Sequence, residues 1–282
     1  MSDVIEVLGK SVVQHGNYND RVYLMKLAKE DLPSIVNRLD HLAKTRGYSK
    51  ILAKVPSFAK EVFTSNGYIA EAHLPDFFNG QDDAYFMGKY LSKQRINVDN
   101  NQVLDEVLTV AQEKSTNEGV VELPNGYKFK RASKQDAEPM AELYRQVFKT
   151  YPFPIFDPDY IKQTMDDNLI YFAVCQDSEI VALSSAEMDI AAQNNEMTDF
   201  ATHPEYRGQN LSVYLLTKME AAMSKEGIKT AYTIARGESF GMNITFAKLG
   251  YRYGGTLKNN TNISGSLESM NVWYKKLSAD RW

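Results

Sequence analysis

The sequence predicts an α/β (α+β) fold in which helices flank a mixed β-sheet. Apolar residues alternate over short stretches, as in strands, and between these stretches they recur every three or four residues, as in helices. Glycine and proline separate the stretches and mark their ends. With 282 residues, 43% of them hydrophobic, the chain is long enough for about two domains with packed cores.

In the first half of the chain, glycine and proline indicate where helices begin and end. Gly47 and Gly67 are expected to close two helices, because glycine readily adopts the left-handed conformation there. Pro56 is expected to open the second helix, where a backbone N–H is not needed. The expected strands are 20–27, 49–55, 68–74 and 84–91, and the expected helices are 30–46, the segment between Pro56 and Gly67, and 99–114.

The second half repeats this alternation. Pro204 is expected to end a strand and Gly227 a helix. Residues 151–158 hold three prolines and predict a stiff aromatic loop. The expected strands are 127–132, 169–175, 179–189, 196–204, 228–235, 251–258 and 269–277, and the expected helices are 134–151, 211–225 and a short one that ends at Leu249.

A polar segment between the two halves predicts a domain boundary, with one domain over 1–118 and a second over 119–282. Residues 49–74 and 229–257 resemble each other, since both are expected to run strand, short helix, Gly-Tyr and strand. We interpret this similarity as a duplicated half-domain. Chance is the alternative, because a glycine followed by an aromatic residue is common after a helix.

Composition excludes several classes of function. A net charge of −4 does not provide the positive field of a nucleic-acid binder, and no apolar run approaches the ~20 residues that span a membrane. The N-terminus lacks the pattern of a signal peptide. We therefore expect a cytoplasmic protein with no nucleic-acid or membrane partner, and the sequence leaves a homodimer open. We also expect no metal, because Cys175 is the single cysteine and no H-E-x-x-H spacing occurs among His15, His41, His73 and His203.

The segment 199–212, DFATHPEYRGQNLS, is the most informative motif. It ends a strand, turns through Pro204 and opens an amphipathic helix at Leu211. A tight loop at this position directs backbone N–H groups of a helix N-terminus toward an anion, and Arg207 adds positive charge. The pattern predicts a phosphate site, and an ordinary surface turn is the alternative.

This motif resembles that of the GNAT acetyltransferase superfamily, R/Q-x-x-G-x-G/A. Arg207 takes the first position, whereas Asn210 and Ser212 replace the two small residues. Asn tolerates the left-handed conformation, so the substitution of Asn210 for Gly is expected to cost little. FAKLGY (246–251) resembles the family's Y-x-K-x-G-F. The resemblance implies a GNAT-type mixed sheet, a partial, degenerate GNAT-like N-terminal domain, and an enzyme that uses acetyl-CoA.

Residues 198–212, 232–251 and 53–87, taken together, look like the beta-lysine N-acetyltransferases, and this resemblance runs essentially end to end. It implies direct acetyl transfer, within a ternary complex, to the N6 amine of beta-lysine, which gives the compatible solute N6-acetyl-beta-lysine. One alternative is the same chemistry on a polyamine or another small diamine. A second alternative is an acyl-CoA-binding module without catalysis.

The resemblance also assigns roles to the motif residues. The loop is implied to bind the pyrophosphate of coenzyme A, and the strand before it the pantetheine arm. Backbone amides near Ala201 and Thr202 are implied to polarise the acetyl carbonyl. The residues expected to bind coenzyme A are Phe200, Ala201, Thr202, Arg207, Gly208, Gln209, Asn210, Leu211, Ser212 and Ser239.

An alkylamine has a pKa near ~10.4, so a base is needed to remove its proton at neutral pH. Asp199 is our first candidate, because it lies on the strand that bounds the acceptor side of the family's cleft, and Glu187 is the second. A strand-edge carboxylate that contacts backbone is the alternative for Asp199. Asp189, Arg236 and Glu238 are the candidates for substrate binding, with Arg236 expected to hold a carboxylate; ordinary surface positions are their alternatives.

The leaving thiolate has no obvious proton donor. Many GNAT enzymes carry a tyrosine two residues before the lysine of Y-x-K-x-G, and this chain has Phe246 there. The thiol pKa near ~8.5 makes departure as the thiolate tolerable. We therefore expect Phe246 to be chemically silent.

Overall fold

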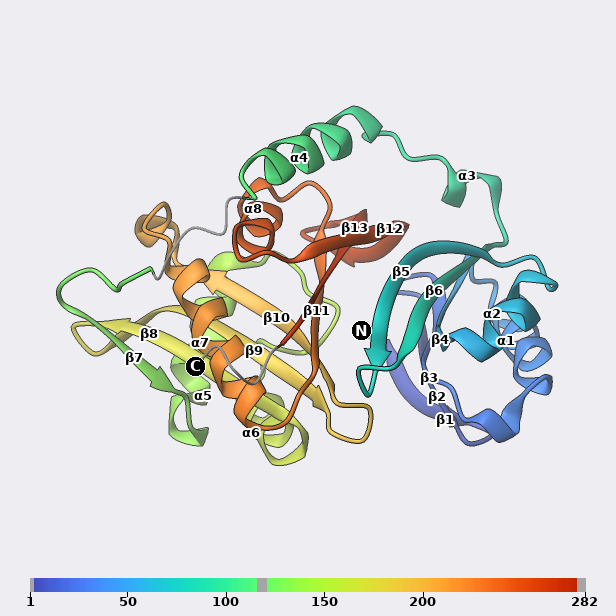
Figure 1. The fold of residues 1–282 in the computed structure, drawn as a ribbon, viewed down its shortest axis with the longest axis horizontal. Helices are drawn as coiled ribbons and strands as arrows, with labels where there is room; N and C mark the ends of the chain where they lie inside the picture. The colour runs from blue at the N-terminus through green and yellow to red at the C-terminus, as the bar shows by residue number, and fades with distance from the viewer. Residues whose placement is uncertain (1–2, 116–120, 278–282) are drawn as a thin grey trace.

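The computed structural model describes residues 3–115 and 121–277. The strands within these ranges form one mixed sheet, with the N-terminal half of the chain at one end and the C-terminal half at the other (Figure 1). Helices flank this sheet, which confirms the predicted fold class. The domain boundary expected at residues 118 and 119 lies outside the described residues.

The N-terminal half begins with a hairpin that the sequence analysis did not identify. Its first strand is an edge strand in which Val4, Ile5 and Val7 are more than half exposed. Because no face of this strand is buried, its sequence lacks the alternation of apolar and polar residues that identifies a strand. Gly47 is the left-handed C-cap of the first helix, as expected. The elements are β1 (Val4–Leu8), β2 (Ser11–Gly16), β3 (Arg21–Lys26), the 3-10 turn η1 (Lys29–Asp31), α1 (Ser34–Arg46), β4 (Lys50–Pro56), α2 (Ser57–Thr64), β5 (Ile69–Phe78) and β6 (Asp82–Tyr90).

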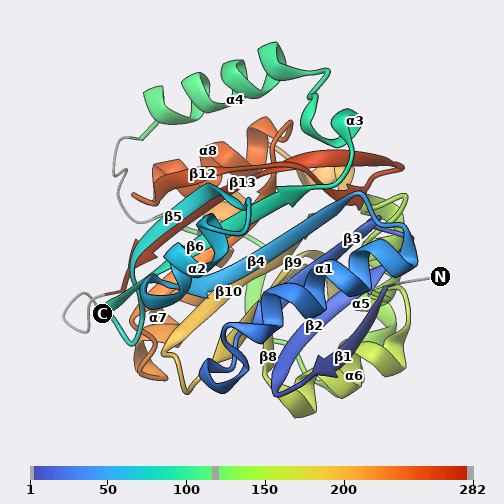
Figure 2. The same ribbon diagram turned by 90° about the vertical axis from the view of Figure 1, so that its right-hand side faces the viewer.

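Two helices connect the halves, α3 (Lys93–Ile96) and α4 (Asn101–Glu113). The second matches the expected helix 99–114 and packs along the C-terminal half, where Ala111 joins the apolar core (Figures 1 and 2). None of the helices in the described ranges has the length and apolar character needed to cross a membrane.

In the C-terminal half, the helix expected over 134–151 is confirmed but is shorter, and a helix over 158–167 was not expected. The helix ends at Val147 because Phe148 has extended backbone and begins the aromatic loop. A second helix follows, capped by Asp157 with Pro158 in its first turn. The elements are β7 (Tyr127–Arg131), η2 (Lys134–Asp136), α5 (Ala137–Val147), α6 (Pro158–Asp167), β8 (Leu169–Gln176), β9 (Glu179–Asp189), β10 (Asn194–Thr202), η3 (Pro204–Tyr206), α7 (Leu211–Lys225), β11 (Thr230–Arg236), α8 (Phe240–Lys248), β12 (Arg252–Ile263) and β13 (Ser266–Lys276).

The strand order has an internal symmetry. It runs β1-β2-β3-β4-β6-β5-β12-β13-β11-β10-β9-β8-β7 across the described strands. β3 is parallel to β4 as β10 is to β11, and β4-β6-β5 has the same antiparallel pairing as β11-β13-β12. This agreement supports our proposal that the chain contains a duplicated half-domain.

The two halves meet where β5 lies beside β12. The backbone there is so close that a Cβ on Gly255 would lie 2.1 Å from the Glu71 carbonyl oxygen, so glycine is required. Beside this contact, Lys50 of β4 forms a fully buried ion pair with Glu71 at 2.8 Å and donates to the Lys258 carbonyl oxygen. One apolar cluster draws Leu52 and Phe86 from the first half and residues of β11, β12 and β13 from the second.

The helices cover outer faces and leave the space between the halves open to side chains. α1 and α2 lie on the side of the N-terminal strands that faces away from the C-terminal half (Figures 1 and 2). In the C-terminal half, α7 and α8 pack in one apolar cluster and α5 and α6 in another. The inner face of the N-terminal strands is therefore available to form a site with the C-terminal half.

Candidate active site

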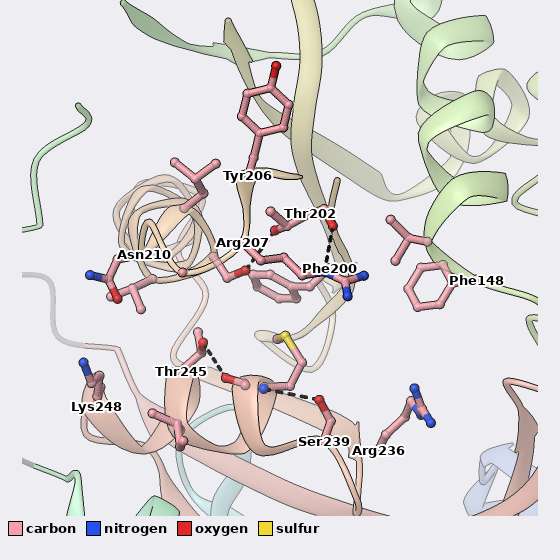
Figure 3. Close-up of a pocket in the computed structure, with 18 residues that line it drawn as sticks. Phe148, Phe200, Thr202, Tyr206, Arg207, Asn210, Arg236, Ser239, Thr245 and Lys248 are labelled. Carbon is pink, nitrogen blue, oxygen red and sulfur yellow. Dashed lines mark hydrogen bonds between the residues drawn. The ribbon is translucent and has the colours of Figure 1, made fainter. Parts of the chain in front are cut away.

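A groove opens where two parallel strands separate. β10 pairs with β11 over residues 194–196, and residues 197–202 continue beyond this pairing. A bulge between Thr198 and Ala201 also shifts the register of β10 against β9. The groove holds about 500 Å³, with the loop before α7 on one wall and α8 on the other (Figure 3).

The loop before α7 has the backbone geometry of an anion site. Asn210 is the N-cap residue in the left-handed conformation, at φ 58°, which confirms that Asn can replace Gly there. No side chain caps this N-terminus, so the N–H groups of the first turn remain available to a ligand. Arg207 lies beside them and donates from Nε to the Thr202 carbonyl oxygen at 3.4 Å. Phosphate groups therefore fit this loop.

Most residues expected to bind coenzyme A line this groove, and two do not. Ala201 is 2% exposed and its side chain packs in the core on the α5 and α6 side. Gln209 instead accepts a hydrogen bond from the Tyr127 hydroxyl at 2.7 Å. The expected residues that line the groove are Phe200, Thr202, Arg207, Gly208, Asn210, Leu211, Ser212 and Ser239. Tyr206 and Lys248, which were not expected, also line it.

A second cavity of about 410 Å³ lies between the halves of the chain. β2, β3 and β4 provide one part of its lining, and β9, β10, β11, α6 and the aromatic loop provide another. Four residues line both this cavity and the groove, so the two spaces meet. They are Phe148, Phe200, Arg236 and Met242.

Asp199 lies in the β10 bulge and lines the second cavity, next to the shared residue Phe200. Its backbone is left-handed at φ 55°, and its side chain is buried. The carboxylate accepts hydrogen bonds from the Tyr151 hydroxyl at 2.6 Å and the Ser185 hydroxyl at 2.5 Å. Burial raises the pKa of Asp199, and these hydrogen bonds act in the opposite direction. Two side-chain hydroxyls therefore hold this carboxylate, in place of the backbone contact at a strand edge that was the alternative.

Two glutamates extend this acidic lining. Glu187 and Glu196 are directly opposite in the β9–β10 ladder and both line the cavity. Burial raises the pKa of Glu187. Burial and the neighbouring charge of Glu187 raise the pKa of Glu196 to about 8. Lys54 approaches from β4, where its ammonium donates to the Tyr232 hydroxyl. The cavity can therefore accept cationic groups and take up protons.

Sequence reasoning missed Glu196, Lys54 and Tyr151. Glu196 had a signal, because it is a charged residue between Asn195 and Met197 within a strand that is otherwise mostly buried. Lys54 had none, since its partners are contributed by the other half of the chain.

The structure does not support three of the expected substrate contacts. Asp189 lies outside the cavity lining and pairs with Lys26 at a partly exposed end of the sheet. Glu238 accepts from Asn100 on the surface. Arg236 lines both spaces, but its guanidinium already makes a two-bond ion pair with Glu268, at 2.9 and 2.6 Å. Asp189 and Glu238 therefore lie away from both spaces, and Arg236 reaches them with its charge already paired.

Phe246 is fully buried in the core and lies outside the lining of both spaces. Its ring packs edge-to-face against Phe200, at 5.6 Å between centroids, and against Tyr251. The position therefore supports the groove from beneath.

Comparisons with known proteins agree with this geometry. The sequence model of the acetyltransferase (GNAT) family matches residues 137–251. The chain is 44% identical to the beta-lysine N(6)-acetyltransferase of Methanococcus maripaludis, over 98% of this chain and 99% of that protein. It is 32% identical to the N-acetyltransferase YodP of Bacillus subtilis, over 95% and 96%. It is 31% identical to the beta-lysine N(6)-acetyltransferase of Methanosarcina mazei, over 86% and 97%.

These relatives extend over both halves, so the similarity includes the N-terminal strands that complete the second cavity. The family model covers the strands, the loop and the helices that build the groove. By fold, site and sequence, the chain belongs to the GNAT family of acetyltransferases.

Proposed function

We propose that the protein transfers the acetyl group of acetyl-CoA to the N6 amine of beta-lysine, directly within a ternary complex. The observation that carries this proposal is the meeting of two spaces at Phe200, one beside a loop suited to anions and one lined by the carboxyl groups of Asp199, Glu187 and Glu196. The names of the two beta-lysine relatives, and their nearly full-length similarity, support the choice of acceptor.

Coenzyme A supplies an activated acetyl group, and the groove provides suitable contacts for it. The N–H groups of the first turn of α7 and the Arg207 side chain hold the pyrophosphate. Residues 197–202, which have left β11, offer free backbone groups on that side to the pantetheine arm. The amides of Ala201 and Thr202 stabilise negative charge on the carbonyl oxygen.

The acidic cavity binds the acceptor and removes its proton. Deprotonating an alkylamine at pH 7 costs roughly 4–5 kcal/mol, at ~1.36 kcal/mol for each pKa unit. Asp199 accepts this proton because it adjoins Phe200, where the two spaces meet, and its raised pKa reduces the mismatch with the amine. Glu187 and Glu196 lie further along the strands and bind ammonium groups of the substrate.

A thiol-release assay with acetyl-CoA tests this function. Release should depend on beta-lysine, and the product should carry the acetyl group on N6. Equal or faster release with 1,5-diaminopentane would favour a general diamine acetyltransferase. Binding of acetyl-CoA without release for any amine would favour the non-catalytic alternative.

A further inference from the structure

An acceptor such as beta-lysine carries a carboxylate that the acidic cavity would repel. Arg236 cannot easily bind it, because Glu268 already holds that guanidinium. The other cationic groups in the lining are Arg21 and Lys54, and both come from the N-terminal strands.

Arg21, at the start of β3, is 5% exposed and lines the cavity. Its Nη1 donates to the Asn260 carbonyl oxygen at 2.7 Å, and its Nη2 donates to the Gln14 side-chain oxygen at 3.3 Å. All these partners are neutral. Within the described ranges, no carboxylate forms an ion pair with this guanidinium; the charges of Asp3 and Glu196 act on it only at a distance, and Asp3 accepts hydrogen bonds from residues 18 and 19.

Two buried hydrogen-bond donors at this end of the cavity have no partner among the described residues. They are the Nε of Arg21 and the side-chain nitrogen of Gln14, which is 1% exposed. The Tyr23 ring lies beneath the Arg21 guanidinium, but a buried cation with no directly bonded anion is still costly, and a buried donor without an acceptor adds to that cost. Burial lowers the pKa of Arg21 to about 10, so the group still carries its charge at neutral pH.

Lys54 is a weaker candidate for the same role. Its ammonium lies near Glu187 and Glu196, whose charges oppose the effect of burial on its pKa, and it contacts the rings of Phe77 and Tyr232. The carboxyl groups beside Lys54 would repel a substrate carboxylate, whereas no carboxylate forms an ion pair with Arg21 within the described ranges.

We propose that Arg21, assisted by Gln14, binds the carboxylate of the acceptor, so that the N-terminal half selects an amino acid over a carboxylate-free diamine. This inference rests on the proposed function. It assigns the N-terminal half a direct role in substrate selection, in addition to its packing role. Guanidinium suits this task because it binds a carboxylate through two parallel hydrogen bonds.

The test compares beta-lysine with pentane-1,4-diamine, which is the same molecule without its carboxylate. Wild-type protein should lose roughly 10²–10³-fold in kcat/KM on the diamine, as expected for loss of one buried charged partner. Arg21→Gln should lose a similar factor on beta-lysine, mainly through KM, and little on the diamine. Arg21→Lys should recover part of the loss on beta-lysine. Arg46→Gln, an exposed arginine on α1, is the matched control and should change neither rate.

The outcomes separate the two proposals. If wild-type protein does not acetylate beta-lysine, the proposed function fails and the inference fails with it. If wild-type protein acetylates beta-lysine but Arg21→Gln and Arg21→Lys reduce both substrates equally, or neither, the inference alone is overturned. Because Arg21 also bonds β12, calorimetric binding of coenzyme A checks that each variant keeps its fold. A variant that no longer binds is replaced by Gln14→Leu, for which the same selective loss on beta-lysine is expected and an equal loss on both substrates overturns the inference.

Discussion

The loops that precede α1 and α7 occupy equivalent places in the two halves, and they have opposite character. The loop before α7 opens a groove, with Arg207 beside an uncapped helix N-terminus. The equivalent loop before α1 contains the side chain of Asp31. This carboxylate is buried and accepts hydrogen bonds from the Lys10 N–H and the Ser11 hydroxyl. The Ser11 hydrogen bond lowers the pKa of Asp31, so the carboxylate stays charged. A phosphate group would be repelled there.

The strands before these loops differ in the same sense. β3 extends only through residues 25–26 beyond its pairing with β4, whereas β10 extends through 197–202 beyond its pairing with β11. The C-terminal half thus has a long unpaired strand edge for a ligand, and the N-terminal half does not. We infer that the C-terminal half binds the acyl donor, and that the equivalent part of the N-terminal half became a wall of the acceptor cavity. Calorimetry should accordingly find one coenzyme A per chain, and two equivalent sites would contradict this difference.

The largest expected effect is on the rate and concerns Asp199, the candidate base of the C-terminal half. Asp199→Asn should reduce kcat/KM for beta-lysine by ~10²–10⁴-fold at pH 7, because the amine loses its proton acceptor. The loss should shrink toward pH 10, where more of the amine is already neutral. Asp31→Asn is the matched change in the N-terminal half. It should lower thermal stability and leave kcat/KM nearly unchanged. A full rate for Asp199→Asn at pH 7 would exclude Asp199 as the base and favour Glu187, the second candidate.

The buried ion pair beside the contact between the halves should be nearly as sensitive, with the free energy of unfolding as the measured quantity. Lys50→Met leaves Glu71 buried without its partner and should lower the free energy of unfolding by about 3–5 kcal/mol. Adding Glu71→Leu should restore part of this loss, since neither charge then remains. Denaturant titration measures both variants, with the exposed Lys44→Met as control. A wild-type midpoint for Lys50→Met would show that this buried pair, and the Lys50 hydrogen bond to the Lys258 carbonyl oxygen, contribute little to stability.

Glu196 should have a moderate effect on rate and a distinctive effect on pH dependence. Glu196→Gln should lose roughly 10-fold in kcat/KM, as for one charged hydrogen bond. The folded-state pKa of about 8 exceeds the ordinary value of 4.5, so the folded protein retains a proton that the unfolded chain releases between these values. Its contribution to stability is therefore full below pH 4.5 and is lost as pH rises through 8. Between pH 4 and 9, the unfolding midpoint should fall less steeply with pH for Glu196→Gln than for wild-type protein. An unchanged slope would show that Glu196 does not cause this pH dependence.

The smallest expected change concerns Phe246. Phe246→Leu should cost about 1–2 kcal/mol of stability through the space it leaves beneath Phe200, with kcat/KM nearly unchanged. Steady-state kinetics and thermal unfolding measure the two effects. Loss of turnover in a folded variant that still binds coenzyme A would mean that the ring acts in the chemistry.

Local pattern was sufficient to predict the groove. The sequence around Arg207 and Asn210 identified the loop, because its elements are consecutive in the chain. The acceptor cavity could not be predicted in the same way. Arg21 and Asn260 are 239 residues apart, and their contact depends on how two sheet halves join. Arg236 was a reasonable candidate by residue type, but its pairing with Glu268 follows from the β11–β13 register.

The placement of the acceptor cavity between the halves also bears on how such an enzyme can diversify. The groove residues come from the C-terminal half, whereas Arg21, Gln14 and Lys54 come from β2, β3 and β4. Substitutions in the N-terminal half could therefore change the acceptor of such an enzyme, while the groove for the acyl donor in the C-terminal half stays the same. We expect variants selected for a new amine to concentrate their changes in those three strands, and sequencing of such selections would reveal the bias.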